Sequence, residues 1–511
     1  MIGSSQALNL RKVMIMKRLH LQLIMLVAAL IFASSCVVQK NPISGNKRAY
    51  AYSWQQEVQI GQEVDQEIVS QYGLYDDEQL KEYVVNLGEE LLEVSHMRRE
   101  GTDEQFKNTE FTFRVLDSPV VNAFALPGGY VYVTRGLMAH LNNEAQLAVV
   151  VGHEIGHVAG RHASQRALTQ TIGQVAVIGG SILGQELLGL PGESLMNLSS
   201  QAAQLLFMSY SRDHERESDR LGVEYSAMKN YVAAEGSEFF TSLRRISEKE
   251  GQNIPNMLST HPNPGEREET IPRLANEWRE RGYEQNVYGT ERYMEMLNGM
   301  IFGDNPRSGY VTEGRFVHPD LEFFYPVPEQ WRTLNQPSQV VLVKGEGEAV
   351  MIMRIDSENT SPNESVSQFV NQEGFTLRER GDTQSSGRWT AHQAEGTIQQ
   401  ENNLLGVHVY AVEFQNRIYR FINYSPESSF EEHIEDFRFV TTEFDQLTDE
   451  SILNIEPVRL QIVEADQRKS FRQYLPGQLP MDMEPEDIAI INQVSLDTTI
   501  EPGTILKIPV Q

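Results

Sequence analysis

Two histidines four residues apart, with a glutamate directly after the first, carry the strongest chemical information in the sequence. They are His153 and His157, with Glu154 between them in the run His-Glu-Ile-Gly-His. On an α-helix this spacing places both imidazoles on one face and the carboxylate beside them. Two such imidazoles can bind zinc, and the carboxylate can act as a base toward a water molecule on the metal. The pattern therefore predicts a zinc hydrolase.

A third ligand is needed, because a catalytic zinc site normally has three protein ligands and one position left for water. Glu215 and Asp219 lie four residues apart in a charge-rich run, so a helix would turn both toward the same side. We expect Glu215 to bind the metal. We expect Asp219 to accept a hydrogen bond from the outer nitrogen of a ligating histidine, which would fix its tautomer. The alternative is that this charged run is only a solvated helix face.

The helix that carries the two histidines has a readable start. Asn143 can cap its first turn, with Gln146 at the third helical position. Three glycines, Gly152, Gly156 and Gly160, recur at every fourth residue within it. A glycine in a helix interior costs roughly 1 kcal/mol relative to alanine. The glycine line therefore predicts that a neighbouring helix or strand approaches this face closely.

Other elements are predicted upstream of that helix. Apolar residues at helical spacing predict helices over 54–72 and 77–95. Alternating runs at 111–116 and 130–133 predict a small antiparallel sheet. An edge strand within 122–133 could hold an extended peptide through main-chain hydrogen bonds, and an ordinary hairpin is the alternative. The candidate substrate-binding residues in this stretch are Asn122, Ala123, Gly128 and Gly129.

The composition limits the partners of the protein. A chain of 511 residues with 40% hydrophobic residues predicts about two to four domains with real cores. The formal net charge of −28 argues against a nucleic acid partner, because phosphates would be repelled. A solvated acidic surface explains that charge more simply. Cys36 is the only cysteine, so no intramolecular disulfide can form.

The N-terminal segment predicts export. Lys12, Lys17 and Arg18 precede an apolar run over 19–32 that is too short for a stable membrane span and fits a secretory signal. The small residues before Cys36 resemble the lipobox of bacterial lipoproteins, whose cysteine becomes lipidated. We therefore expect a signal peptide over 1–36 and a lipid anchor on Cys36. The alternative is an incidental cysteine near a conventional cleavage site.

The residue after that cysteine bears on the destination. Val37 is not the aspartate associated with inner-membrane retention, which favours an outer-membrane lipoprotein that faces the periplasm. A tether over 37–52 would join the lipid to the folded body. An apolar, glycine-containing run at 172–190 predicts a helix and loop beside the active site, with contact to a membrane surface as the alternative.

Three motifs in order make the chain similar to the M48 family of zinc metalloendopeptidases, over about residues 55–278. The motifs are the stretch 122–133, the His-Glu-Ile-Gly-His run, and the stretch 210–219. The resemblance is to the soluble, exported branch, and it implies a mainly α-helical zincin-type domain with a small β-sheet over 53–303. It also implies a zinc site whose ligands are His153, His157 and Glu215, with Glu154 as catalytic base.

One residue departs from the family pattern, and one segment adds a candidate. Ser218 stands where the family commonly has alanine, which leaves both acidic positions intact. His261, in a segment that also resembles the family, could stabilise the oxyanion, serve as a removable fourth ligand that silences the enzyme, or simply form a loop. Tyr210 and Arg267 are further candidates for stabilising the reaction's tetrahedral intermediate.

The C-terminal half predicts two accessory domains. A linker near 304–309 is followed by strand-like runs and two helical pieces, which predict an α+β domain over 309–445 without catalytic residues. Gln415 and Asn416 are expected to close a hairpin. The segment 456–511 resembles a LysM module in its latter part, which implies a β-α-α-β unit of the kind associated with peptidoglycan. Packing is the alternative role of that unit.

The sequence thus predicts a zinc-dependent endopeptidase that cleaves misfolded or misassembled polypeptides of the cell envelope. One rival is a peptidoglycan-associated or chaperone-like lipoprotein whose metal site is weak or latent. A second rival is a glycan hydrolase that uses the same metal.

Overall fold

The computed structural model describes residues 37–169, 205, 209–250, 257, 260–261, 264–400, 403–480 and 483–511. The predicted signal peptide, its Cys36 and the apolar run at 172–190 lie outside these residues. Among the helices of the described ranges, none is both long enough and apolar enough to span a bilayer.

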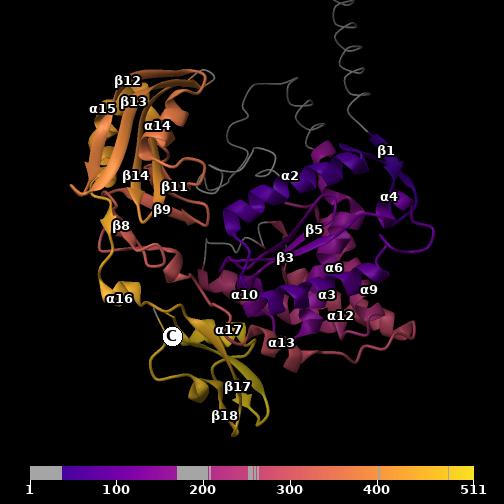
Figure 1. Cartoon of the computed structure of the whole chain (residues 1–511). Coiled ribbons are helices and arrows are strands. Elements are labelled where there is room, and N and C mark those ends of the chain that lie inside the picture. The colour runs from indigo at the N-terminus through magenta and orange to yellow at the C-terminus, as the bar shows by residue number, and fades with distance from the viewer. Residues whose placement is uncertain are drawn as a thin grey trace, which may run out of the picture.

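The first part of the chain is a helical body around a small sheet, coloured indigo to magenta in Figure 1. The helices expected over 54–72 and 77–95 are present, and Ser53 closes a capping box at the start of the first. The helices of this body are α2 (Trp54–Tyr72), α3 (Glu78–Val94), α4 (Glu104–Lys107), α5 (Arg135–His140), α6 (Glu144–Gly160), α9 (Arg212–Met228), η1 (Ala233–Glu235), α10 (Gly236–Glu250), α12 (Pro264–Glu280) and α13 (Thr290–Leu297).

The sheet of this body has the strand order β3-β5-β4. Its strands are β3 (Thr112–Leu116), β4 (Ala123–Leu126) and β5 (Tyr130–Thr134). The two runs expected to pair antiparallel, β3 and β5, are parallel instead. The reason is that β4 and not β3 forms the hairpin with β5, so that the chain reverses twice, once before β4 and once after it, before β5 pairs with β3.

The stretch expected to be a tether is folded. β1 (Val37–Lys40) and β2 (Lys47–Tyr50) form an antiparallel hairpin. Tyr50 is fully buried, and the Arg161 guanidinium, one residue beyond α6, lies 3.7 Å from the centre of its ring. Arg161 also donates two hydrogen bonds to the buried Glu57 carboxylate of α2. This hairpin is therefore fastened to the end of the helix that carries the two histidines.

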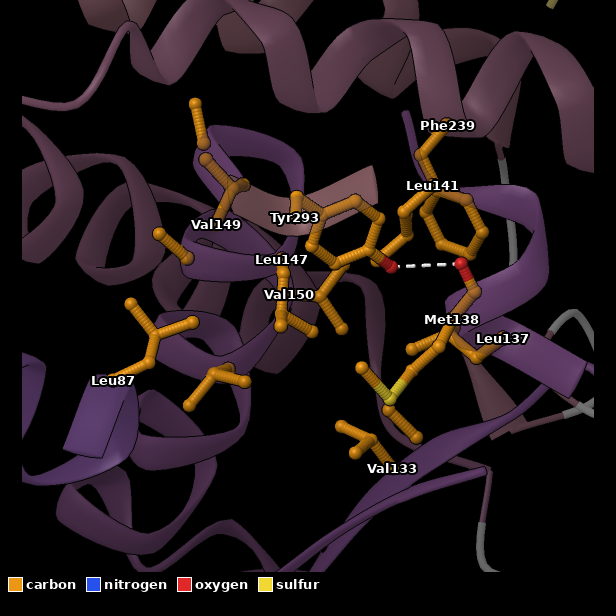
Figure 2. Packing of buried hydrophobic residues seen from close by; sticks show 14 of the residues in the cluster. Leu87, Val133, Leu137, Met138, Leu141, Leu147, Val149, Val150, Phe239 and Tyr293 are labelled. Carbon is orange, nitrogen blue, oxygen red and sulfur yellow. Dashed lines mark hydrogen bonds between the residues drawn. The ribbon is translucent and has the colours of Figure 1, made fainter. Parts of the chain in front are cut away.

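That helix, α6, is enclosed on all sides. Asn143 caps it by accepting a hydrogen bond from the Gln146 backbone, as expected, and every residue of α6 is buried. Figure 2 shows Leu147 and Val150 of α6 packed among side chains from α3, α5, α10 and α13. The buried hydroxyl of Tyr293, on α13, donates a hydrogen bond to the Met138 carbonyl oxygen at 2.7 Å. A helix that is buried on every face in this way forms part of the core.

The second part, orange in Figure 1, is a seven-stranded antiparallel sheet with the order β12-β13-β14-β15-β11-β10-β9 and a four-stranded sheet with the order β16-β8-β7-β6. Alternate residues of β14 pack under α14 and α15, which cover opposite faces of the larger sheet. The expected hairpin is confirmed: Gln415 and Asn416 both have positive φ, at 49° and 60°, as a two-residue turn requires.

The elements of this second part begin at the predicted linker. Two of its strands, β12 and β13, are polar and were not predicted. The elements are η2 (Pro306–Ser308), β6 (Tyr310–Thr312), β7 (Arg315–His318), β8 (Phe323–Pro326), β9 (Trp331–Gln336), β10 (Gln339–Lys344), β11 (Ala349–Asp356), α14 (Pro362–Val370), β12 (Phe375–Ser385), β13 (Trp389–Gln400), β14 (Asn403–Phe414), β15 (Arg417–Pro426), η3 (Glu427–Ser429), α15 (Phe430–Thr442) and β16 (Asp445–Gln446).

The C-terminal unit, yellow in Figure 1, lies against the helical body. Its isoleucines and leucines belong to the same apolar core as α6. The Nζ of Lys507 is buried and donates to the carbonyls of Ala139 and Leu141, at 2.7 and 2.6 Å. The elements of this region are α16 (Glu450–Leu453), β17 (Arg459–Glu464), β18 (Lys469–Ser470), η4 (Phe471–Tyr474), α17 (Pro485–Ile491), β19 (Thr499–Ile500) and β20 (Ile505–Val510), with β17 and β20 paired antiparallel.

Replacing Lys507 by Met should destabilise the protein by about 1–3 kcal/mol, because two buried carbonyls at the end of α5 lose their donor. Urea unfolding measures this change. The control is Arg468→Met, which removes a cation of the same unit whose side chain is 70% exposed. Equal midpoints for the two variants would contradict the fastening role of Lys507.

His408, under α15, should make stability depend on pH. Burial lowers the pKa of its imidazole from 6.5 to about 3. Below pH 6.5 the His408 imidazole therefore binds a proton in the unfolded chain but not in the folded chain. The free energy of unfolding falls as the pH drops from 6.5 toward 3. The loss between pH 7 and pH 5 should be about 2 kcal/mol. Urea unfolding at both values should show a smaller loss for His408→Gln. An identical loss in both proteins would disprove the assignment.

Candidate metal centre

Helices α6 and α9 touch through backbone, and this contact builds the centre. A Cβ on Gly152 would lie 3.1 Å from the Gly222 Cα, and a Cβ on Gly222 would lie 2.7 Å from the Val149 carbonyl oxygen. A Cβ on Gly156 would lie 3.2 Å from the Ser218 Cα. The close neighbour that the glycine line predicts is therefore α9. Its approach places Glu215 opposite the two histidines of α6.

Four buried side chains converge at this point: His153 and His157 of α6, Glu215 of α9, and His261, which lies between α10 and α12. One potential ligand atom from each lies within 4.8 Å of all the others. The Nε2 atoms of His153 and His157 are 3.0 Å apart. His261 Nδ1 is 3.3 Å from His153 Nε2 and 3.2 Å from each Glu215 oxygen.

These separations fit a zinc ion. The nearest Glu215 oxygens lie 3.4 Å from His157 Nε2 and 3.7 Å from His153 Nε2. In a tetrahedron with zinc bonds of about 2.0–2.1 Å, neighbouring ligand atoms are separated by about 3.3 Å. Three imidazole nitrogens and one carboxylate oxygen are ligands that zinc accepts. The donor set and its spacing therefore suit zinc, and all four corners come from this chain.

Glu154 lies beside these four residues and is fully buried, yet neither of its carboxylate oxygens has a hydrogen-bond partner among the residues that the structure describes. His261 Nε2 lies 3.7 Å from Glu154 Oε1, and it too has no hydrogen-bond partner in the described part of the chain. Burial raises the pKa of Glu154, and the charges of His261 and His153 oppose that shift. A buried carboxylate without partners is costly, so its presence calls for a ligand or a reaction that uses it.

The acid expected to orient a ligating histidine is in position. Asp219 Oδ1 lies 2.8 Å from His153 Nδ1, on the side of the ring away from the other donors. Arg267, considered at first for stabilising an intermediate, instead donates its Nε to Asp219 Oδ2 at 3.0 Å and pairs with Glu215. Burial alone would raise the pKa of Glu215, but the charges of His261 and Arg267 bring it well below its usual value. Glu215 is therefore an anionic donor.

On the other side of the centre lie His162, which the sequence interpretation missed as a site residue, and Tyr210, which it named as a candidate. His162 Nδ1 is 3.1 Å from His157 Nδ1, and His162 Nε2 is 3.1 Å from Glu217 Oε2. The Tyr210 ring packs over the His157 ring, with 4.0 Å between centroids. Burial lowers the pKa of His157 and keeps its imidazole neutral, as metal binding requires. The signal that could have revealed His162 is a third histidine in the same short run.

The candidate substrate-binding residues lie in and beside the β4–β5 hairpin. Gly128 and Gly129 form its turn with φ of 83° and 108°, and a Cβ on Gly128 would lie 2.5 Å from the Val58 Cα. Those two glycines therefore serve the turn and its packing on α2. Ala123 lies in β4, which is an edge strand of the described sheet. Asn122 is nearly buried, and its backbone bonds to Thr134.

Comparison with known proteins gives a family for this part of the chain. Residues 88–275 match the model of peptidase family M48. A putative beta-barrel assembly-enhancing protease of Vibrio cholerae is 32% identical over 194 residues, which cover 37% of this chain and 38% of that protein. The human mitochondrial metalloendopeptidase OMA1 is 32% identical over 175 residues, 32% of each chain. The beta-barrel assembly-enhancing protease of Escherichia coli K12 is 28% identical over 242 residues, 47% of each chain.

The aligned regions span less than half the length of each of these relatives. All three relatives are named as proteases or metalloendopeptidases, in agreement with the matched family. The matched residues 88–275 also contain all four of the converging donors and Glu154. This region of the chain is therefore similar to peptidase family M48.

Proposed function

We propose that the protein is a zinc-dependent endopeptidase that hydrolyses peptide bonds of misfolded or misassembled cell-envelope polypeptides. The observation that carries the proposal is the pair of unpartnered Glu154 oxygens, buried next to four converging metal donors. A merely structural zinc site would have no use for a free carboxylate at that place. A hydrolase needs one as its general base.

A zinc ion held by His153, His157 and Glu215 would polarise the scissile carbonyl and lower the pKa of a water molecule from 15.7 toward about 7. Glu154 then takes one proton from the attacking water as its oxygen adds to the carbonyl carbon. The same carboxyl gives that proton to the leaving nitrogen as the C–N bond breaks. Burial raises the pKa of Glu154, which makes the carboxyl a better proton acceptor for this transfer.

His261 decides whether water can enter. Its Nδ1 fills the fourth corner of the donor set, and a catalytic site must keep one position open. We therefore take His261 as a removable fourth ligand that has to withdraw before turnover. Its other ring nitrogen lies 3.7 Å from Glu154 Oε1, so stabilisation of the oxyanion is the alternative role of His261.

The relatives support the substrate class and the compartment. One of them is named a beta-barrel assembly-enhancing protease and another a putative one, and these names support a role for this chain in β-barrel assembly. We propose the same setting here: an exported lipoprotein anchored through Cys36 and facing the periplasm, with a zincin-type domain over 53–303. An extended polypeptide would pair with the β4 edge, near Ala123.

The remaining domains have structural and recruiting roles in this proposal. The 309–445 domain contains no cluster of metal donors among its described residues. The 456–511 unit resembles a LysM module, and its burial against the helical body supports packing as its role. Peptidoglycan binding by its exposed side would be compatible with that packing.

One specific observation favours a second function. Because four protein donors close the site, the zinc could be latent, and the protein would then be a peptidoglycan-associated or chaperone-like lipoprotein. Hydrolysis of casein that stops with a zinc chelator and returns with zinc separates the two functions. Release of muropeptides without proteolysis would indicate a glycan hydrolase instead.

Replacing Glu154 by Gln should leave zinc content unchanged and lower kcat by about 10²- to 10⁴-fold, because the base is lost while the ligands remain. Metal analysis and casein hydrolysis measure the two effects. The matched comparison is Glu215→Ala, which should lose both zinc and activity. Full activity in zinc-loaded Glu154→Gln protein would refute the role of this carboxylate.

Replacing His261 by Ala should keep zinc on three ligands and raise the initial rate of casein hydrolysis. The gain should equal the inverse of the fraction of molecules in which His261 has withdrawn. Titration with a chromophoric chelator verifies zinc retention. A fall in kcat with zinc retained would contradict the silencing role and assign His261 to oxyanion stabilisation.

A further inference from the structure

His162 is a fully buried histidine that lies between a proposed metal ligand and a surface carboxylate. Its Nδ1 lies 3.1 Å from His157 Nδ1, and its Nε2 lies 3.1 Å from Glu217 Oε2. His157 Nε2, on the opposite edge of that ring, points toward the other donors of the centre. The three groups therefore form one chain from the centre to the edge of α9.

The backbone is shaped to hold this ring in place. Arg161 ends α6 in the left-handed conformation, with φ 58°, so His162 does not continue the helix. A Cβ on Gly160 would lie 2.3 Å from His162 Nε2, which means that the ring fills the space this glycine leaves. On its other side the ring stacks on His214 of α9, with centroids 4.3 Å apart and planes at 11°.

The positions of the hydrogens follow from metal binding. A histidine that binds zinc through Nε2 must carry its hydrogen on Nδ1, so His157 donates toward His162. His162 Nδ1 must then be the acceptor, which puts its own hydrogen on Nε2. That hydrogen points at Glu217, whose carboxylate can only accept. The two hydrogen bonds thus run in the same direction, from His157 to His162 and from His162 to Glu217, and each N–H has an acceptor.

We propose that Glu217 and His162 are positioning residues for the metal centre, which hold His157 in the tautomer and orientation that ligation requires. The inference rests on the proposed zinc function and deepens it. His153 is held directly by Asp219, as a ligating histidine commonly is. His157 has no such direct carboxylate contact on its Nδ1 side. Its link to the Glu217 carboxylate runs through the His162 ring, which lies between them.

Ser218 adds a feature of this chain to the arrangement. Its buried hydroxyl lies 3.3 Å from His162 Nδ1, the same atom that faces His157. The hydroxyl can donate there and share the single lone pair of that nitrogen with His157, which favours the tautomer in which His162 Nδ1 is the acceptor. Glu217 is also 4.0 Å from Arg220 on the same helix, which helps to keep its carboxylate ionised.

The test measures zinc affinity by competition with a chromophoric chelator, together with the visible ligand-field spectrum of the Co²⁺-loaded protein. We expect Glu217→Ala and His162→Ala to weaken zinc binding by about 10- to 100-fold, as loss of an outer hydrogen-bond partner does. Glu217→Gln should fall between the wild type and Glu217→Ala, because its amide oxygen can still accept from His162. The Co²⁺ spectrum should shift in both alanine variants.

Asp213→Asn is the matched control, since it removes an exposed carboxylate from the same helix. Affinities and Co²⁺ spectra of the Glu217 variants equal to those of this control would overturn the proposal. If His162→Ala does not fold, the Glu217 variants decide, because Glu217 is partly exposed and its removal leaves no cavity in the core. Casein hydrolysis by the zinc-loaded wild type is measured separately. A wild type that binds zinc tightly without cleaving casein defeats the proposed function and leaves the positioning role standing.

Discussion

The backbone contact between α6 and α9 is the constraint on which the rest of the centre depends. A glycine in the interior of a helix costs roughly 1 kcal/mol relative to alanine, and α6 has two, Gly152 and Gly156, on the face that meets α9. In return, α9 comes close enough for Glu215 to reach the same point as His153 and His157. Zinc ligands must be placed to within about 0.2 Å, so helices separated by even one methyl group could not provide this site.

The buried charges around the centre are unbalanced in a way that a cation would correct. With the histidines neutral, as metal ligation requires, the described residues of the centre bury three carboxylates, those of Glu154, Glu215 and Asp219, and one guanidinium, that of Arg267, which pairs with Glu215 and Asp219. Burying an unpaired charge is expensive, and the raised pKa of Glu154 expresses that cost. A divalent cation between the donors would offset the excess negative charge, so the geometric fit and the electrostatic fit support the same ligand.

Sequence reasoning succeeded where one helix fixes the spacing and failed where the chain reverses. The spacing of four residues was enough to place His153 beside His157 and to put Asp219 on the side of α9 that faces them. It could not place His162, because the left-handed turn at Arg161 breaks the helical period. The parallel pairing of β3 with β5 depends on which strand closes the hairpin, and the alternation within each strand carries no information on that choice.

The sequence also did not predict that the C-terminal unit packs against the helical body. A lysine is rarely buried, and Lys507 is buried only because its Nζ donates to two carbonyls at the end of α5. These long-range contacts depend on surfaces that exist only after the local elements have formed. The same holds for the use of Arg267, which pairs with Asp219 and Glu215 only because α12 lies against α9.

The distribution of the four donors over the fold determines which of them can leave. His153, His157 and Glu215 lie on two helices that are locked by glycine contacts and buried in one apolar core. Displacing any of the three would separate those helices. His261 lies off both helices, and its backbone nitrogen donates to the Met257 carbonyl at 2.7 Å. Its withdrawal would therefore not require α6 and α9 to separate, so opening the fourth position costs less than displacing one of the other three donors. His261 can therefore occupy or leave the fourth position while His153, His157 and Glu215 stay in place.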